Sequence, residues 1–570
     1  MSEPIIEFSN FGFQYNAQSA PTLHNIDLAI RKGEKVVIVG PSGCGKSTLA
    51  HCMNGLIPFS YRGESTGTVR LRGRETKELG LFEISRTVGT VLQDSDGQFI
   101  GLTVAEDIAF ALENDCVRDP ALHERVLKAA KAVGIDSHLS HAPSQLSGGQ
   151  KQRVALAGVM VDDVELLLFD EPLANLDPAT GKTAMELIDE IHASTGAAVV
   201  IIEHRLEDVL HRDVDRIVLM QSGRIISDST PDELLSGDLL RENGIREPLY
   251  ITALKYAGVR VTPEMQPHSI RTVQLTEAVQ ARVRDWFHSM PPAAEKRFGE
   301  PLLDASDIGF SYENTGHRAL DGVSVSVRAG ELLAIVGKNG AGKSTFSKVV
   351  CGFETQQRGT LRFRDIDLMT LSIKERADHI GYVMQNPNQM ISQTMIFDEV
   401  AMGLRTRKTP EAEIRPRVEE TLKICGLWPF RNWPISALSF GQKKRVTIAS
   451  ILVLEPEIII LDEPTAGQDY RHYTDIMEFL TELNARGITV ILITHDMHLI
   501  LEYADRAVVF CDSRVIANDS SANILTDRDV IDRASLKETS LYELALRCGI
   551  DDARGFVQRF IDYEREVVRK

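Results

Sequence analysis

Short runs of apolar residues alternate along the chain with segments whose apolar residues recur at helical spacing. Runs such as KVVIVG, ELLLFD, AAVVII and DRIVLM are typical of strands buried on both faces of a sheet. Because helical stretches separate these runs, the pattern predicts an α/β fold with a mainly parallel sheet flanked by helices. No apolar run approaches the roughly 18 to 20 residues needed to span a bilayer, so we expect no transmembrane segment.

The second half of the chain repeats the first. GPSGCGKST at residues 40–48 returns as GKNGAGKST at 337–345, and LSGGQKQR at 146–153 returns as LSFGQKKR at 438–445. The offset is 297 residues from Lys46 to Lys343 and 291 from His204 to His495. Landmarks in the same order at a nearly constant offset indicate an internal duplication.

Four segments are expected from this repeat and from the residues between its halves. Residues 1–235 and 301–520 are predicted to form two tandem nucleotide-binding domains of the P-loop type. Residues 236–300 end in the proline-interrupted MPPAAEKRFGEP and read as an accessory helical region and linker. Residues 521–570 alternate apolar and charged residues at helical spacing, which predicts a C-terminal helical appendage.

Composition narrows the class of protein. With 570 residues, 43% of them hydrophobic and 25% charged, the chain is an ordinary globular sequence long enough for at least two cores. A net charge of -18 opposes nonspecific binding to nucleic acid, so no nucleic-acid partner is expected. The seven cysteines form no CxxC pair and are expected to be reduced thiols. The N-terminus has no basic start and no apolar stretch, so we expect a cytoplasmic protein.

The pattern G-x-x-x-x-G-K-[ST] follows an apolar strand in both halves, which predicts two phosphate-binding loops. Its glycines let backbone N–H groups face the phosphates, and Lys46 and Lys343 would reach the β- and γ-phosphates. The predicted ATP-binding loops comprise Gly40, Pro41, Ser42, Gly43, Cys44, Gly45, Lys46, Ser47 and Thr48 in the first half, and Gly337, Lys338, Asn339, Gly340, Ala341, Gly342, Lys343, Ser344 and Thr345 in the second. A helix start favours a thiolate, so Cys44 is expected to alkylate readily, unless it is only an inert small residue.

Acidic residues and a histidine complete a constellation in each half. Asp170 and Asp462 end apolar strands, where an acid is costly unless it serves a cation, and we expect them to face Mg²⁺. Glu171 and Glu463 follow as candidate general bases or water-orienting groups, with helix N-capping as the alternative. His204 and His495 follow the next strand, where each is predicted to contact the γ-phosphate or the attacking water rather than to be a structural loop histidine.

Each half contains, in the same order, the glycine loop, a glutamine, an LSGGQ-like segment, a strand that ends in Asp-Glu, and a histidine. This order of motifs resembles the ATPase domains of ABC proteins over most of both halves. This resemblance implies that the signature segment of one domain completes the ATP site of the other in a head-to-tail pair. The signature residues would be Ser147, Gly148, Gly149 and Gln150, and Ser439, Phe440, Gly441 and Gln442, with Phe440 standing where the family usually has glycine. It also implies Mg²⁺ ligands at Ser47, Asp170 and Gln93, and at Ser344, Asp462 and Gln385. Tyr15 and Tyr312 would stack on adenine, or else be partly buried strand aromatics.

The segments QDSDGQFIGLTVAEDIAFALEN, QNPNQMISQTMIFDEVAMGLRT and GIREPLYITALKYAG look like those of energy-coupling factor (ECF) importers, which take up vitamins, their precursors or transition metals. This resemblance implies a peripheral ATPase on the cytoplasmic face of the membrane. Its partners would be a transmembrane coupling subunit and a small substrate-binding membrane subunit. The alternatives are a fused sugar-importer ATPase and a soluble two-domain ABC ATPase acting on ribosomes. The transported molecule does not follow from the sequence.

Overall fold

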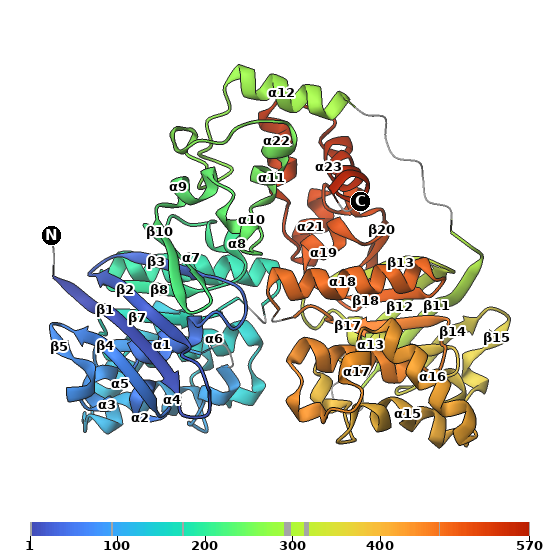
Figure 1. The fold of residues 1–570 in the computed structure, drawn as a ribbon, viewed down its shortest axis with the longest axis horizontal. Coiled ribbons are helices and arrows are strands. Elements are labelled where there is room, and N and C mark those ends of the chain that lie inside the picture. Colours follow the sequence, from blue (N-terminus) through green and yellow to red (C-terminus); the bar gives the residue numbers. More distant parts are fainter. Residues whose placement is uncertain are drawn as a thin grey trace. The chain divides into compact units, whose positions relative to one another are not determined.

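The computed structural model describes residues 3–92, 95–173, 176–289, 298–312, 318–466 and 468–568. The chain forms two compact units, Met1–Trp286 with Asp469–Arg471, and Phe287–Gln468 with His472–Lys570. In Figure 1 each unit contains its own strands with helices around them, coloured blue to green in the first unit and yellow to red in most of the second.

The central sheet of the first unit has the strand order β10-β9-β3-β8-β7-β6. Neighbouring strands from β9 to β6 are parallel, and β10 pairs antiparallel with β9. The mainly parallel sheet predicted from the sequence is therefore confirmed. Its strands are β3 (Lys35–Val39), β6 (Val88–Val91), β7 (Leu166–Asp170), β8 (Ala198–Ile202), β9 (Arg216–Gln221) and β10 (Arg224–Ser229).

Burial on both faces explains why the strands are continuous apolar runs. Val37 and Val39 of β3 belong to a core shared with α4, α5, α6 and α7, whereas Val36 and Ile38 belong to a second core shared with α1. The helices of this part are α1 (Lys46–Met53), α2 (Leu56–Phe59), α3 (Leu81–Ser85), α4 (Val104–Asn114), α5 (Ala121–Ala132), α6 (Gly148–Met160), α7 (Pro178–Thr195) and α8 (Leu206–Val209).

A separate antiparallel sheet, which the sequence analysis did not predict, completes the first unit. Its order is β2-β1-β4-β5, and its strands are β1 (Pro4–Tyr15), β2 (Leu23–Arg31), β4 (Gly63–Leu71) and β5 (Arg74–Glu75). Phe8 and Phe13 of β1 share the second core with Leu49 of α1. The sheet therefore packs beside the helix that follows the first phosphate-binding loop.

The second unit has the same two sheets. The central one has the order β16-β17-β18-β13-β19-β20, with parallel pairs from β16 to β19, and the antiparallel one has the order β12-β11-β14-β15. Its strands are β11 (Pro301–Ser311), β12 (Arg318–Arg328), β13 (Leu332–Gly337), β14 (Arg358–Phe363), β15 (Ile366–Asp367), β16 (Ile380–Val383), β17 (Ile458–Asp462), β18 (Thr489–Ile493), β19 (Arg506–Cys511) and β20 (Arg514–Asp519). Its helices up to residue 502 are α13 (Lys343–Cys351), α14 (Ile373–Arg376), α15 (Ile396–Thr406), α16 (Glu411–Ile424), α17 (Phe440–Leu452), α18 (Tyr470–Ala485) and α19 (Met497–Glu502). The helices α15, α16 and α17 lie together at the lower edge of this unit in Figure 1.

Helices also occupy the two stretches outside the repeated cores for which the sequence predicted them. Those after β10 are α9 (Pro231–Ser236), α10 (Leu239–Glu242), α11 (Leu249–Tyr256) and α12 (Glu277–His288). Those after β20 are α20 (Ser521–Ile524), α21 (Arg528–Ala534), α22 (Ser540–Arg547) and α23 (Ala553–Tyr563). The domain boundaries at residues 235, 300 and 520 stay predictions.

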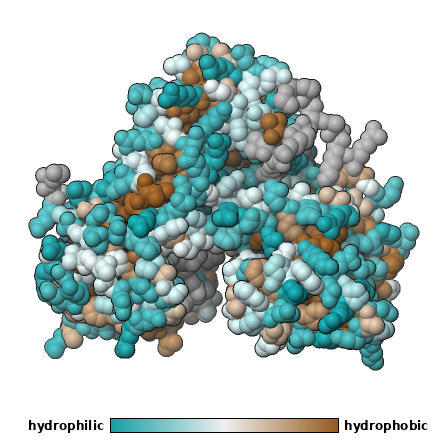
Figure 2. All heavy atoms as spheres, viewed as in Figure 1, coloured by the Kyte–Doolittle hydropathy of each residue, from teal (hydrophilic) through white to brown (hydrophobic). Residues whose placement is uncertain are grey.

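The surface is polar over most of the face drawn in Figure 2, where hydrophobic residues form small groups on each unit. Within the described ranges, no helix combines the length and the apolar character that crossing a membrane requires.

Candidate functional site

Each phosphate-binding loop joins a buried central strand to the helix that follows it. In the first unit β3 leads into α1, whose N-cap Gly45 has a φ of 106°, and in the second unit β13 leads into α13, whose N-cap Gly342 has a φ of 104°. This backbone conformation is accessible to glycine and strained for other residues. The loops therefore present backbone N–H groups at a helix N-terminus, which is an arrangement that binds phosphate.

The loop lysines are buried and close the loops on themselves. Lys46 is 5% exposed, and its Nζ donates to the carbonyl oxygens of Gly40 at 2.7 Å and Pro41 at 3.1 Å. Lys343 Nζ donates in the same way to Gly337 at 2.6 Å and Lys338 at 2.9 Å. Each unit thus holds an ammonium group beneath the loop that would carry the phosphates.

Tyr15 and Tyr312 lie beside the two loops. Tyr15 Oη is 3.1 Å from Thr48 Oγ1, and Tyr312 Oη is 3.3 Å from Thr345 Oγ1, so each tyrosine contacts the first turn of the helix after its loop. Both tyrosines are partly buried. The structure brings them next to the predicted ATP loops, and their stacking on adenine stays a prediction.

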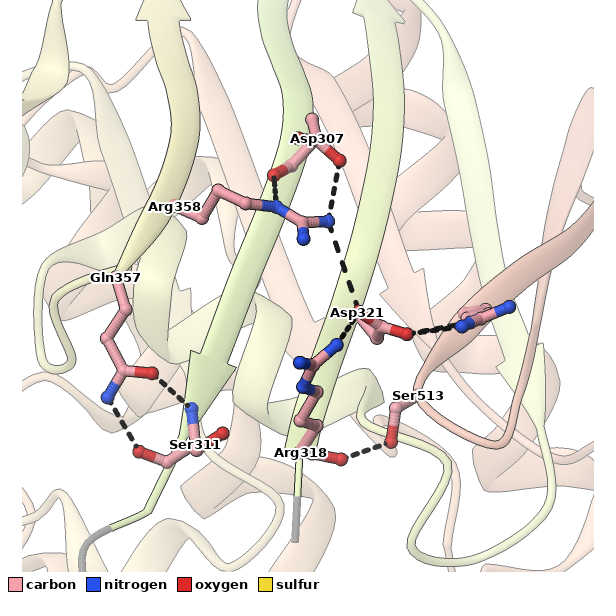
Figure 3. A network of polar contacts seen from close by, with 8 residues as sticks. Asp307, Ser311, Arg318, Asp321, Gln357, Arg358 and Ser513 are labelled. Carbon is pink, nitrogen blue, oxygen red and sulfur yellow. Dashed lines mark hydrogen bonds and ion pairs between the residues drawn. The ribbon is translucent and has the colours of Figure 1, made fainter.

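Side-chain bonds hold the sheet whose strand β11 ends immediately before Tyr312. Figure 3 shows Gln357 facing the backbone of Ser311, from which its Oε1 accepts and to which its Nε2 donates, each at 3.0 Å. In the same view Arg318 and Arg358 converge on Asp321. These contacts join β11, β12 and the start of β14.

Asp170 and Asp462 end β7 and β17, but their carboxylates have different partners. Asp170 Oδ1 is buried without a hydrogen-bond partner among the described residues, and burial, together with Glu171, raises its pKa to about 6. Asp462 Oδ2 accepts from Tyr382 Oη at 2.9 Å. Burial raises the pKa of Asp462 even though Tyr382 and Ser344 hydrogen-bond to its carboxylate.

A glutamate and a histidine meet in each unit, as the sequence predicted they would lie near one site. Glu171 Oε1 is 2.7 Å from His204 Nε2, and Glu463 Oε1 is 2.8 Å from His495 Nδ1. Burial opposes ionisation of Glu171, but the hydrogen bond and charge of His204 outweigh it and lower the pKa of this carboxyl. Glu171 and Glu463 have φ angles of 50° and 45°. Such left-handed backbone in a non-glycine residue is strained and is often found at functional sites.

Of the two glutamines predicted to bind Mg²⁺, the structure describes only the second. Gln93 lies outside the described residues. Gln385 is exposed, and its backbone oxygen accepts from Lys444 Nζ at 2.7 Å, as does that of Met384 at 2.9 Å. Lys444 is 1% exposed, and burial lowers its pKa to about 8.

The signature segments begin α6 and α17 with a capping box. Ser147 Oγ accepts from the backbone of Gln150 at 3.4 Å, whose Oε1 accepts in return from Ser147 N at 2.9 Å. Ser439 and Gln442 form the same pair at 3.3 and 3.0 Å. The Phe440 ring, which replaces glycine, is 46% exposed. Both helix starts are therefore built alike despite this replacement.

The structure argues against the expectation that Cys44 alkylates readily. Its side chain is only 3% exposed, and burial raises the pKa of the thiol, so that the thiolate is disfavoured. The helix start does not offset the loss of solvent around the sulfur. The structure therefore favours the alternative, in which Cys44 is an inert small residue.

Three residues at these sites were missed by the sequence analysis, namely Glu203, Tyr382 and Lys444. Each stands where the halves of the repeat differ: Glu203 in IIEHR matches Thr494 in LITHD, Tyr382 matches Thr90, and Lys444 matches Gln152. A position-by-position comparison of the halves would have identified them. Their contacts, however, depend on burial, which a motif does not reveal.

Comparisons with known proteins support the likeness seen in the motifs. A family model described as ABC transporter matches residues 23–174 and again 320–466, and a model described as ATP-binding cassette cobalt transporter matches residues 237–310. A protein of Clostridium perfringens, described as an ABC transporter ATP-binding protein, is 57% identical over 98% of both chains. One of Enterococcus faecalis with the same description is 57% identical over 100% of both chains.

Among solved structures, cbiO1 of Clostridium perfringens, described as part of the ABC transporter complex cbiONQ, is 35% identical. It covers 41% of this chain and 94% of its own, with a TM-score of 0.38. The family model matches more than half of the chain, and both relatives match nearly all of it. The chain therefore belongs to the family of ABC transporter ATP-binding proteins, and it is an ATPase with two tandem ABC domains.

Proposed function

We propose that this chain hydrolyses MgATP at two sites and energises an ECF-type importer of a vitamin, a vitamin precursor or a transition metal. The observation that carries this proposal is the match of residues 237–310 to the ATP-binding cassette cobalt transporter model, in a chain whose two halves both keep a full set of ATPase residues. ECF importers of the resembled class use such paired ATPases. The expected partners are a transmembrane coupling subunit and a small substrate-binding membrane subunit.

The acidic strand ends fit a magnesium ion. Asp170 Oδ1 is buried and has no hydrogen-bond partner in the described part of the chain, which is costly for a carboxylate unless a cation compensates it. Oxygen ligands suit Mg²⁺. The proposed ligands are Ser47, Asp170 and Gln93 in the first half and Ser344, Asp462 and Gln385 in the second. When bound with ATP, the ion would neutralise charge on the β- and γ-phosphates.

The Glu171 and His204 pair has the features needed to hold an attacking water. The lowered pKa of Glu171 keeps its carboxylate ionised and able to accept a proton or a hydrogen bond from water. His204 lies against that carboxylate, where it would fix the orientation of Glu171 and contact the γ-phosphate. Glu463 and His495 would act in the same way in the second unit.

Each site would be completed by the signature segment of the other unit. Lys46, Asp170, Glu171 and His204 would work with Ser439, Gly441 and Gln442. Lys343, Asp462, Glu463 and His495 would work with Ser147, Gly149 and Gln150. A helix N-terminus with a serine hydroxyl is suited to a phosphate anion, which supports this head-to-tail pairing.

An exposed apolar loop supports docking to a membrane subunit. Leu102 is 82% exposed and Ile100 is 64% exposed, although both lie in a loop that α4 holds in place. Ile100 N donates to Asp107 Oδ1 at 2.9 Å, and Leu102 N donates to Glu106 Oε2 at 2.9 Å. An ordered loop that keeps large apolar side chains in solvent is typical of an interaction site. We assign it to a cytoplasmic helix of the transmembrane coupling subunit.

Co-sedimentation with membrane vesicles tests this proposal. The full chain is expected to pellet with vesicles that contain the coupling and substrate-binding subunits and to stay in the supernatant with empty vesicles. Leu102→Glu is expected to reduce pelleting about tenfold or more while ATP hydrolysis by the isolated chain persists, because an anchor residue of an interface carries a large share of the binding energy. Ile226→Glu, at a residue of β10 that is 40% exposed, is the control and should pellet normally.

The outcome also separates the alternatives. Pelleting with ribosomes but not with vesicles would contradict the importer and favour the ribosomal ATPase. Uptake of a vitamin or metal ion by vesicles carrying the complete complex, dependent on ATP, would establish the ECF class. Uptake of a sugar alone would favour the fused sugar importer.

A further inference from the structure

Glu203 is a buried glutamate immediately before His204, and in the described part of the chain its carboxylate accepts hydrogen bonds from backbone N–H groups. It is 2% exposed. Oε1 accepts from Leu173 N at 2.8 Å, and Oε2 accepts from His204 N at 2.8 Å and Arg205 N at 3.2 Å. In the described ranges no cationic side chain forms an ion pair with it. Such a charge is tolerated in the interior because charge-assisted bonds from N–H groups replace its solvent.

The three N–H groups belong to two different segments of the site. Leu173 comes two residues after Glu171, in the segment that follows β7, whereas His204 and Arg205 follow β8. One carboxylate therefore ties the segment that carries Glu171 to the turn that carries His204. The two tied segments meet again where Glu171 Oε1 lies 2.7 Å from His204 Nε2.

In the second unit, other residues hold the turn that carries the histidine. Thr494 stands in place of Glu203, is fully buried, and accepts from Asp496 N through its Oγ1 at 3.0 Å. Asp496, in place of Arg205, accepts from His498 N at 2.9 Å and Leu499 N at 3.4 Å and so caps α19. His495 then meets Glu463 through Nδ1 rather than Nε2. These bonds of Thr494 and Asp496 join the histidine turn of this unit to the backbone of its own segment.

We infer that Glu203 is a positioning residue of the first ATP site, which sets the distance and orientation of His204 relative to Glu171 by bonding both of their segments. This inference rests on the proposed roles of Glu171 and His204 in hydrolysis. The first site thereby differs mechanically from the second, since any shift of the segment after Glu171 moves the His204 turn with it. Small errors in the placement of reacting groups reduce rates strongly, so Glu203 affects the rate without touching ATP.

Single-turnover hydrolysis in the full chain tests the inference. In a Glu463→Gln background, which blocks the second site, rapid quenching reports one turnover at the first. Glu203→Gln keeps the volume but places an amide donor against a backbone donor. It is expected to slow this turnover about tenfold or more, with a less than about twofold change in the ATP concentration for half-saturation. A general loss of stability would not slow the turnover while leaving the half-saturating ATP concentration unchanged.

Rescue by the turn of the second unit makes the test specific. Glu203→Thr combined with Arg205→Asn supplies a hydroxyl acceptor and a helix cap in place of the carboxylate. This double variant is expected to return the rate to within about threefold of the Glu463→Gln parent, since a local turn can hold the histidine. If Glu203→Gln fails to fold, Glu203→Thr alone replaces it as the slow variant. Glu247→Gln, at a buried glutamate paired with Lys255, is the matched control and should keep the parent rate.

Three results would overturn the inference: a parent rate in Glu203→Gln, a rise in half-saturating ATP that parallels the loss of rate, or a double variant as slow as the single one. His204→Ala in the same background separates this failure from that of the proposed function. If His204→Ala is slow and Glu203→Gln is not, only the positioning role fails. If His204→Ala also keeps the parent rate, the proposed role of His204 fails.

Discussion

The same residue type at the same position of the repeat does not have the same surroundings. Asp170 has a buried oxygen without a partner in the described residues, whereas Asp462 accepts from Tyr382. The motif was sufficient to predict that both carboxylates end a strand. It could not predict the partner, because Thr90 and Tyr382 belong to apolar strands that contain no signal of their own.

The rate at which Cys44 reacts with a thiol reagent tests whether burial suppresses its reactivity in the first loop. Because Cys44 is buried and its pKa is raised, we expect it to react with maleimide slowly both with and without ATP. Cys116 is exposed and is expected to react first. Mass spectrometry of labelled peptides at pH 7 measures both rates. Cys116→Ser should remove the fast phase, and fast labelling of Cys44 would show that the loop opens in solution.

At the scale of elements, strands and helices with a strong pattern were predicted, and the antiparallel sheets were not. The central strands are continuous apolar runs because both faces are buried, so KVVIVG and ELLLFD identify β3 and β7 directly. In contrast, β1 is 12 residues long and its register with β2 shifts at several points, which interrupts the alternation that would mark a half-buried strand. The pairing of β1 with β4 is also distant in sequence.

Lys444 connects two such elements, the signature helix α17 and the segment that carries Gln385. We predict that this connection stabilises the segment. The ammonium of Lys444 donates to the backbone oxygens of Met384 and Gln385, and Lys444→Met would fill the space but leave both acceptors unpaired. We expect faster amide hydrogen exchange in residues 384–390 and little change in β13. Hydrogen exchange with mass spectrometry compares the two. Lys374→Met, at an exposed lysine of α14, is the control. Unchanged exchange at 384–390 in Lys444→Met would contradict the role of Lys444 in holding this segment.

At the scale of the whole molecule, duplication was the most informative feature of the sequence. Two copies of each motif indicated the candidate sites, although neither the boundaries of the domains nor the roles of individual residues follow from repetition alone. The copies have since diverged in their supporting residues, as Glu203 and Thr494, Tyr382 and Thr90, and Lys444 and Gln152 illustrate. The residues proposed to act on ATP were retained on both sides, which argues that both sites are used.

The last prediction concerns this symmetry. Glu171→Gln and Glu463→Gln keep the size of the side chain but remove the charge that would orient or activate water, so each variant is expected to trap ATP at its own site. Because release at the blocked site would be needed before the next cycle, each single variant should lose more than half of the steady-state ATP turnover. Phosphate release measures turnover, and retention of labelled ATP after gel filtration measures trapping. Glu186→Gln, at a partly exposed glutamate of α7 that pairs with His211 and Arg212, serves as the control. If one variant keeps near wild-type turnover while the other is inactive, the tolerant site is regulatory, and the divergence of the supporting residues has a functional consequence.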